Sequence, residues 1–198
     1  GWARLGAGLR GLASAGMDLV LPHTCPGCGS PEPWCAACAA TLDGRPRAVI
    51  PPEAVLDHFA VAGRPVPALH ALSRYAGPAR GAIIAGKERG RRDLPPRLGR
   101  ALGHGLTALQ DAGVLPGDLW LVPAPTRKSA ARARGGDPVL AMARAAAALL
   151  AAAGRPAGVA PCLYLARRTR DSVGLDAAAR ARNLAGAIAF SPAGAPPD

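Results

Sequence analysis

Two pairs of cysteines near the start of the chain constrain its fold more than any other feature. The sequence reads CPGC, then six residues, then CAAC, so Cys25 and Cys28 form one CxxC hook and Cys35 and Cys38 form a second. The loop between the hooks is short enough to bring both to one ion. Four cysteine thiolates around one ion are the ligand set of a structural zinc site. The spacing therefore predicts a small zinc-ribbon-like module.

Two other interpretations of the four cysteines remain open at this point: two disulfides, or a thioredoxin-type redox pair. Disulfides need an oxidising compartment, and a redox CxxC normally comes once, where a helix begins after a strand. His23 lies two residues before the first hook and is expected to be a bystander. Cys162 lies in a strand-like segment, PCLYLA, and is expected to be a buried core thiol.

A site with four cysteine ligands has no open coordination position, so its expected role is to hold a segment that has little core of its own. Charge divides the chain in the same place. Residues 1–45 carry three arginines and three acids, so the whole net charge of +11 belongs to residues 46–198. We expect a module over 1–45, comprising an N-terminal helix and the zinc ribbon, and a second domain over 46–198 that contacts any anionic partner.

No stretch of the sequence predicts a membrane span. The most uniform apolar stretch, residues 145–153, is mostly alanine and too weakly hydrophobic for a bilayer. The opening segment contains Arg10 and several glycines, which interrupt any apolar region of a signal peptide, and is expected to form a short helix. We therefore expect a cytoplasmic protein.

The second part of the chain alternates between strand-like and helix-like segments. We expect an extended stretch over 58–75, helices that open at Gly77, Leu94 and Asp137, a helix over 175–184, and strands in DLWLVP, PCLYLA and AGAIAF. Leucines at spacings of three and four form one apolar stripe on the second helix: Leu98, Leu102, Leu106 and Leu109. This alternation predicts an α/β domain with a mainly parallel sheet covered by helices on both faces.

Ligands of such sheets bind at the carboxyl ends of the strands, so the loops after DLWLVP and PCLYLA are the candidate sites. Both loops are basic. The first carries Arg127, Lys128, Arg132 and Arg134, and the second carries Arg167, Arg168 and Arg170. Two cationic loops at one edge of a sheet would bind a polyanion such as a pyrophosphate or a nucleic-acid backbone. The alternative is that these arginines are simply solvated.

The order of these motifs resembles the ComF family of competence-associated, phosphoribosyltransferase-like proteins. The segments that carry the resemblance are LVLPHTCPGCG, WCAAC, RYAGPARGAIIAGKERGRRDL, LVPAPTRKSAARARGGDP and LARRTRDSVGLDAAARARNLAGAIAF. The resemblance implies a zinc module joined to a type I phosphoribosyltransferase-like α/β domain. It implies that Pro123, Ala124 and Pro125 border the pyrophosphate, next to the basic run that ends at Arg134. Further matches to the family are Lys87, Arg89 and Gly90 in a K-x-R-G motif, and Arg182 with Asn183 in a late R-N pair.

The chain lacks the family's paired acids and Thr-Thr-Gly loop, which would bind the ribose and 5-phosphate of phosphoribosyl pyrophosphate (PRPP). It ends in SPAGAPPD, where that element would begin, and we therefore expect either a product truncated at its C-terminus or a degenerate protein. The resemblance implies a transferase that uses PRPP with magnesium when the complete site exists, and a role in competence and DNA uptake. The alternatives are a non-catalytic accessory that binds single-stranded DNA or other DNA-uptake proteins, and an inactive fragment.

Overall fold

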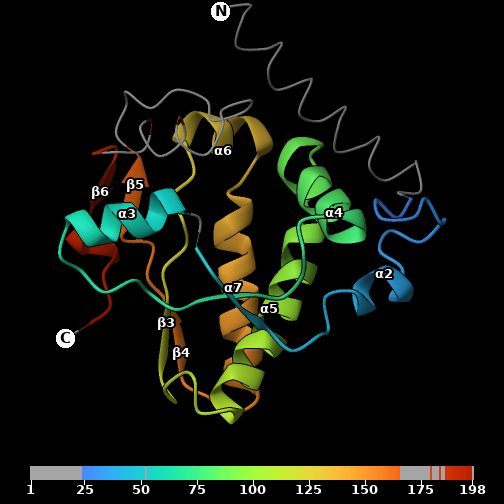
Figure 1. The fold of residues 1–198 in the computed structure, drawn as a ribbon. Coiled ribbons are helices and arrows are strands. Elements are labelled where there is room, and N and C mark those ends of the chain that lie inside the picture. Colours follow the sequence, from blue (N-terminus) through green and yellow to red (C-terminus); the bar gives the residue numbers. More distant parts are fainter. Residues whose placement is uncertain (1–23, 52, 166–178, 180–182, 184–185, 198) are drawn as a thin grey trace, which may run out of the picture.

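The fold is mixed α/β, with a helical core flanked by short pairs of strands (Figure 1). The structure, a computed structural model, describes residues 24–51, 53–165, 179, 183 and 186–197. The elements follow in this order: α2 (Ala36–Ala40), β1 (Arg47–Val49), α3 (Glu53–Val61), β2 (Leu69–Ala71), α4 (Gly77–Glu88), α5 (Leu94–Asp111), β3 (Leu119–Leu121), α6 (Lys128–Arg134), α7 (Pro138–Ala152), β4 (Ala157–Val159), β5 (Leu163–Leu165), β6 (Ile188–Phe190) and a 3₁₀ turn at Pro192–Gly194.

Helices α5 and α7 pack directly on each other through small residues. A Cβ atom at Gly99 would overlap the carbonyl of Met142, and one at Gly103 would lie 3.2 Å from the carbonyl oxygen of Ala146. The facing side of α7 consists largely of alanine and includes the fully buried Ala146. Two backbones that approach this closely fill the core without large side chains. This explains how a chain with few aromatic residues builds a packed interior.

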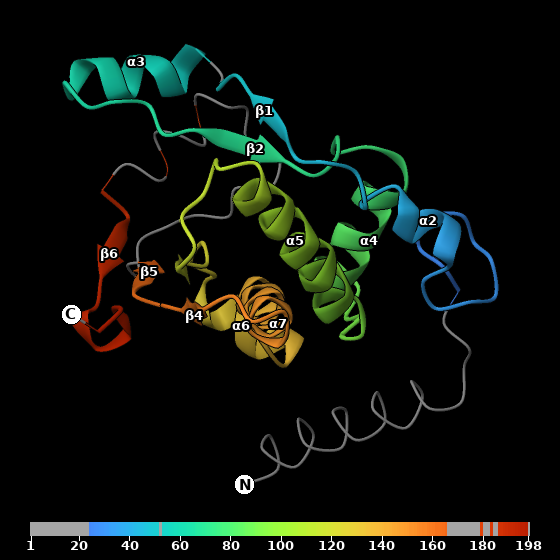
Figure 2. The same cartoon turned by 90° about the horizontal axis from the view of Figure 1, so that it is seen from below.

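The predicted leucine stripe of α5 is confirmed in part. Leu98 and Leu109 are buried, whereas Leu102 and Leu106 are only half-buried. Gly99 and Gly103 of the same helix take the positions closest to α7, because residues without a side chain allow the two helices to approach. Figure 2 shows α5 between α7 and the β1–β2 pair, with α4 beside it.

The described strands form three separate two-stranded sheets. β3 pairs with β4 in parallel, whereas β1 pairs with β2, and β5 with β6, in the antiparallel sense. The mixed α/β class predicted from the sequence is therefore confirmed. Within the described residues, however, the single mainly parallel sheet that we expected is not seen, and one pair alone is parallel.

Two local predictions were wrong. Residues 53–61 form helix α3, although part of this segment was expected to be extended. Residues 128–134 form helix α6 where a polar loop was expected, because alanine and arginine favour helix and Gly135 ends it with a left-handed φ of 69°. Strand β4 was not predicted at all. The helix predicted over 175–184 falls almost wholly outside the described residues.

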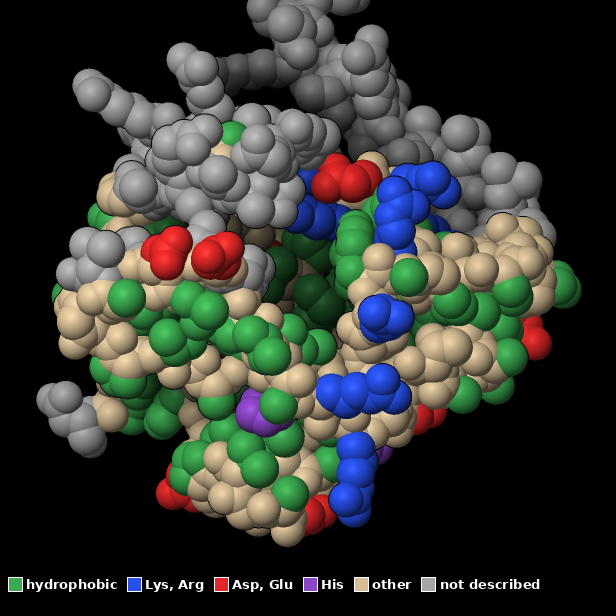
Figure 3. Space-filling model, in the orientation of Figure 1, with side chains coloured by type: hydrophobic (Ala, Val, Ile, Leu, Met, Phe, Trp, Pro, Cys, Tyr) green, Lys and Arg blue, Asp and Glu red, His purple; other side chains and the backbone are tan. Residues whose placement is uncertain are grey.

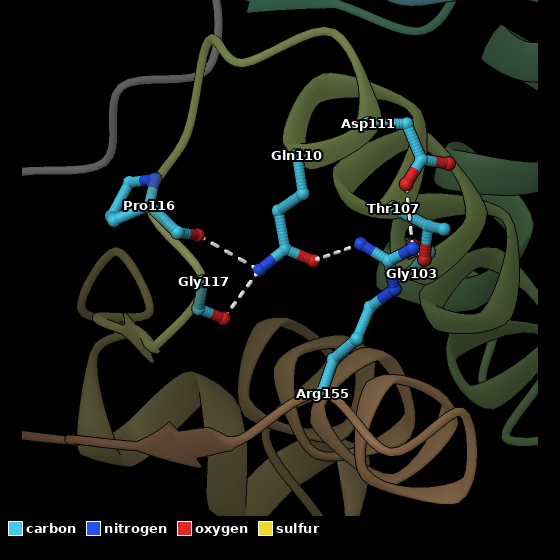
Figure 4. A network of polar contacts seen from close by, with 7 residues as sticks. All are labelled: Gly103, Thr107, Gln110, Asp111, Pro116, Gly117 and Arg155. Carbon is cyan, nitrogen blue, oxygen red and sulfur yellow. Dashed lines mark hydrogen bonds and ion pairs between the residues drawn. The ribbon is translucent and has the colours of Figure 1, made fainter.

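The far ends of α5 and α7 are joined by a polar network around Arg155 (Figure 4). Arg155 donates hydrogen bonds to Gln110 and to Asp111 on the last turn of α5. The amide of Gln110 in turn donates to the carbonyl oxygens of Pro116 and Gly117, at 2.9 and 2.6 Å. These bonds give hydrogen-bond partners to two backbone carbonyls of the loop that leads into β3. The network therefore fixes where that strand begins relative to the helices.

Candidate functional site

The four predicted cysteine ligands come together at one point. The Sγ atoms of Cys25, Cys28, Cys35 and Cys38 all lie within 4.8 Å of one another, and those of Cys28 and Cys35 are 3.5 Å apart. Zinc–sulfur bonds of about 2.3 Å place tetrahedral sulfurs roughly 3.5–4 Å from one another. The donor set and its spacing therefore fit a four-coordinate metal ion such as zinc. All five cysteines of the chain are free thiols, so neither hook forms a disulfide in the structure.

Local backbone geometry brings the two hooks together. The first hook is a tight turn that Gly29 closes with a φ of 79°, and its amide donates to the carbonyl of Cys25. The second hook opens helix α2. Cys35 is the N-cap of that helix, and its sulfur accepts a hydrogen bond of 3.4 Å from the amide of Cys38. An amide that donates to sulfur stabilises the thiolate form, which is the form that binds metal.

The cluster perturbs the acidity of its thiols in opposite directions. Burial opposes ionisation of Cys25, but hydrogen bonds from the backbone of Cys35, Gly27 and Cys28 outweigh it and lower the pKa of the Cys25 thiol to about 6. A hydrogen bond from the backbone of Ser30 lowers the pKa of Cys28. Burial, together with the neighbouring sulfurs, raises the pKa of Cys38. One site thus combines a thiol that ionises readily with a thiol that resists ionisation, as expected where four sulfurs share a small space.

The segment around the cysteines, residues 24–42, has no buried cluster of its own apart from the cysteines. Leu42 belongs to the same buried cluster as Ala82 and Leu98, and Trp34 packs against both this cluster and the cysteines. A Cβ atom at Gly81 of α4 would overlap the carbonyl of Pro26 inside the first hook. Residues 24–42, which we call the metal-binding segment, are therefore docked closely onto α4 and α5. Figures 1 and 2 both show α2 beside α4, on the opposite side of the molecule from β6.

Arg91, in the turn between α4 and α5, holds the metal-binding segment in place against these helices. Its guanidinium donates to the carbonyl oxygens of Thr24 and Pro33, at 2.9 and 2.8 Å. It also pairs with both carboxylate oxygens of Asp93, each at 2.8 Å. The Arg91 side chain is only 10% exposed. A buried guanidinium with this many acceptors is a structural anchor, because every donor that points inward has a partner.

A pocket of about 510 Å³ opens where β3 and β5 end. Its lining combines the chain that leaves β3, the start of α6 and α7, β5, and Ser191 after β6. The lining residues are Pro123, Ala124, Pro125, Thr126, Lys128, Asp137, Leu140, Pro161, Leu163, Tyr164, Leu165 and Ser191. We call this the β3–β5 pocket. Figure 3 shows a hollow with an apolar floor on this face of the molecule, and lysine and arginine side chains along one side of the same face.

Asp137 contributes a carboxylate to this pocket. As predicted from the Asp-Pro sequence, it is the N-cap of α7, where its Oδ1 accepts from the amides of Val139 and Leu140. The same oxygen accepts a hydrogen bond of 3.0 Å from the hydroxyl of Thr126. The cap therefore connects the loop after β3 to the start of α7 within the lining of the pocket.

The structure brings together only some of the predicted anion-binding residues. Pro123, Ala124, Pro125 and Lys128 line the pocket. Arg134 points elsewhere and pairs with Glu88 at 3.2 Å, and Arg132 is exposed on α6. Arg127 is the N-cap of α6 and is half-buried. Arg167, Arg168 and Arg170 lie outside the described residues, but they follow closely after Leu165, which lines the pocket.

Sequence reasoning missed two functional roles. Arg91 was noted only as part of the segment RYAGPARGAIIAGKERGRRDL, which carries the family resemblance, and Thr126 was not singled out. The partners of Arg91 in the metal-binding segment lie 67 and 58 residues away in sequence, so no local pattern marks them. Thr126 forms its hydrogen bond with a predicted helix cap, which was the one available signal. Of the family's late R-N pair, Arg182 lies outside the described residues, and Asn183 is half-buried.

Comparison of the chain with protein-family models, with curated proteins and with solved structures finds no match in any of the three. Across the described part of the chain, no helix has both the length and the apolar character that crossing a bilayer requires.

Proposed function

We propose that Cys25, Cys28, Cys35 and Cys38 bind one structural zinc ion. The observation that supports this proposal is the convergence of four sulfurs within 4.8 Å on a segment whose own buried cluster consists of cysteines. A closed site of four thiolates leaves no coordination position for water or substrate, so the ion would stabilise the fold and take no part in a reaction. Zinc would then hold residues 24–42 in the shape that α4 and Arg91 recognise.

We further propose that the chain is a ComF-like, phosphoribosyltransferase-type protein associated with competence and DNA uptake, and that its β3–β5 pocket binds phosphate groups. The pocket supports this proposal because it combines the Val-Pro-Ala-Pro loop after β3 with Lys128 and with the end of β5. An edge where strands end and helices begin is the usual position of phosphate sites in α/β domains.

The charge within the pocket limits what it can bind tightly. Among the described lining residues, Lys128 is the one cation and Asp137 the one carboxylate. A pyrophosphate group would meet that carboxylate at close range unless a divalent cation such as magnesium lay between them. The paired acids and hydroxyl-rich loop that the family uses for ribose and 5-phosphate have no counterpart in the sequence. We therefore infer weak binding of PRPP by these residues alone.

A nucleic-acid-binding accessory is a second candidate, and a specific surface favours it. Residues 80–100, on α4, the following turn and the first half of α5, carry five exposed cations: Arg80, Lys87, Arg89, Arg92 and Arg100. The two acids of this stretch, Glu88 and Asp93, pair with Arg134 and Arg91. An exposed run of unbalanced positive charge attracts a phosphate backbone without reading its sequence.

Two titrations test these proposals. Calorimetry measures PRPP binding with and without magnesium, and fluorescence anisotropy measures binding of a labelled single-stranded oligonucleotide over a range of salt concentrations. We expect no tight magnesium-dependent binding of PRPP, and we expect DNA binding that weakens steeply with salt. For single strands the slope of log K against log salt is about −0.7 per phosphate contact.

Variants of α6 refine the test. Arg132→Ala should flatten the salt slope by about one contact, because this side chain is exposed and can reach a phosphate. Arg134→Ala should change it less, because Arg134 already pairs with Glu88. Micromolar, magnesium-dependent PRPP binding would show that the enzyme proposal holds for this chain as it stands. DNA binding that is insensitive to salt would exclude the electrostatic account.

A further inference from the structure

The turn between α4 and α5 contacts the metal-binding segment on one side and helix α6 on the other. This turn, residues 88–93, begins with the last residue of α4 and ends with the N-cap of α5. Gly90, at its centre, has a φ of 71°, which lets the chain reverse within a few residues. Because the chain reverses so sharply, consecutive side chains of the turn contact different elements, the metal-binding segment on one side and α6 on the other. A displacement of the metal-binding segment is therefore carried to α6.

On the metal side, the contact consists of the guanidinium of Arg91. Two of its four described acceptors are backbone carbonyls of the metal-binding segment. Thr24 directly precedes the ligand Cys25, and Pro33 lies two residues before Cys35. These carbonyls are in place only while the segment between the two hooks is folded. In small four-cysteine sites, that folding depends on the metal.

On the other side, the same turn holds the end of α6. Glu88 pairs with Arg134, the last residue of α6, at 3.2 Å. The guanidinium of Arg92 lies directly over Gly135, so that a Cβ atom there would overlap it. Gly135 is the left-handed residue that ends α6. The turn therefore holds α6 at its last residue and at its C-cap.

Helix α6 in turn contributes its first residue to the lining of the β3–β5 pocket. Lys128, its first residue, lines the pocket, and the Thr126–Asp137 hydrogen bond closes the segment that contains the helix. The helix has seven residues and no buried side chain, so little besides its two ends holds it in place. An isolated helix of this length is unstable in water, which makes its position sensitive to those end contacts.

We propose that metal binding by the four cysteines orders α6, and with it the part of the β3–β5 pocket lining that Lys128 contributes, through the turn at residues 88–93, with Arg91 as the positioning residue. Loss of the metal releases Thr24 and Pro33, and Arg91 then keeps Asp93 as its partner but loses its anchor to the metal-binding segment. The contacts that Arg92 and Glu88 make with α6 weaken as a result. This inference rests on the proposed metal site and requires no particular ligand in the pocket.

Hydrogen–deuterium exchange read by mass spectrometry tests the coupling on the full chain. Peptides that cover residues 126–137 report on α6, and peptides from α5 and α7 serve as internal references. Metal content is measured on the same samples before and after treatment with a zinc chelator. We expect zinc removal to speed exchange over 126–137 by about fivefold or more, the lower end of typical coupling between sites, and to change α5 and α7 much less.

Variants at Arg91 distinguish the effect of losing the Arg91 contacts from the effect of losing the metal. In the zinc-loaded protein, Arg91→Ala should speed exchange over 126–137 toward the zinc-free level. Arg91→Lys keeps the charge but cannot form the forked set of hydrogen bonds, so it should give an intermediate value. Arg100→Ala removes an exposed arginine from α5 and should leave exchange over 126–137 unchanged.

Two outcomes would overturn the inference: exchange over 126–137 that responds to neither zinc nor the Arg91 variants, or an equal increase across α5, α6 and α7, which would mean general unfolding. A protein that holds no metal would refute the proposed metal site. In that case a change over 126–137 in Arg91→Ala would still establish the link from the turn to α6, and its absence would refute both.

Discussion

Gly81 of α4 lies so close to the carbonyl oxygen of Pro26 that any side chain at this position would overlap it. This approach seats the first cysteine hook on the helix. In a free helix, a change from glycine to alanine gains about 1 kcal/mol of stability. Here the added methyl group must displace backbone, and overpacking of this kind costs about 1–3 kcal/mol.

We therefore predict that Gly81→Ala lowers the free energy of unfolding and weakens metal retention, despite its favourable helix propensity. Chemical denaturation of the zinc-loaded protein measures the first effect and competition with a chelator the second. Gly44→Ala is the matched control, because a Cβ atom at Gly44 meets nothing within 4 Å. A Gly81→Ala protein as stable as the parent would show that the hook is not seated as described.

The zinc content of the protein should depend on the four clustered cysteines and not on Cys162. Elemental analysis of the purified, reduced protein should find about one zinc ion per chain. Cys38→Ser should lose the metal, because a hydroxyl is a poor substitute for a thiolate in a tetrahedral site. Cys162→Ser should retain it, since Cys162 is buried and does not belong to the cluster. Full zinc content in Cys38→Ser would contradict the assignment.

Zinc retention should depend on pH in a direction set by the thiols. Metal binding requires thiolates, so protons compete with the ion. The lowered pKa of Cys25, about 6, keeps this ligand ionised above that pH, and the ligand is protonated as the pH falls through 6. We expect zinc to be held at pH 8 and released between about pH 6.5 and 5.

The number of protons released on binding gives a second measurement. The raised pKa of Cys38 means that this thiol gives up its proton only when the metal binds, whereas Cys25 is already ionised at pH 8. Zinc titrations in buffers of different ionisation enthalpy should therefore count fewer than four protons at pH 8. A count of four would show that Cys25 is protonated before the ion binds.

Asp137 should prove to have two separable roles. Asp137→Ala removes the cap of α7 and its bond to Thr126, which should cost about 1 kcal/mol of stability. Asp137→Asn keeps an oxygen for the cap but removes the negative charge from the pocket. We expect Asp137→Asn to be nearly as stable as the parent and to bind inorganic pyrophosphate more tightly, because Asp137 is the one carboxylate among the described lining residues of the pocket. Equal pyrophosphate affinity in parent and Asp137→Asn would show that this anion binds elsewhere on the surface.

Sequence patterns were most informative where the interaction is local. The cysteine spacing predicted the cluster, and Asp137 before Pro138 predicted the start of α7, because in both cases the partners lie within a few turns of chain. Short elements escaped prediction for a physical reason. Strand β4 has three residues and includes Gly158, and α6 has seven residues, so neither provides enough periodicity to distinguish it from a loop.

Long-range placement could not be predicted from the sequence. In the sequence, the turn that contains Arg91 looks like another exposed basic loop. Only the fold shows that Arg91 is turned inward and donates a hydrogen bond to the carbonyl of Thr24. The pairing of strands belongs to the same class of information. The alternation of strands and helices favoured a mainly parallel sheet, yet β5 and β6 run antiparallel. The order of elements does not by itself fix strand direction, so the sequence could not predict this pairing.

The shared packing of Leu42 and Trp34 with α4 and α5 has a consequence for how the protein is made. The metal-binding segment leaves the ribosome before its packing partners exist, since Leu98 and Ala101 are synthesised more than fifty residues after Leu42. During that interval its two hooks are available to metal but have no surface to dock on. Zinc bound by the nascent chain would fold the metal-binding segment before α4 and α5 are synthesised. These two helices would then pack against a segment that is already folded.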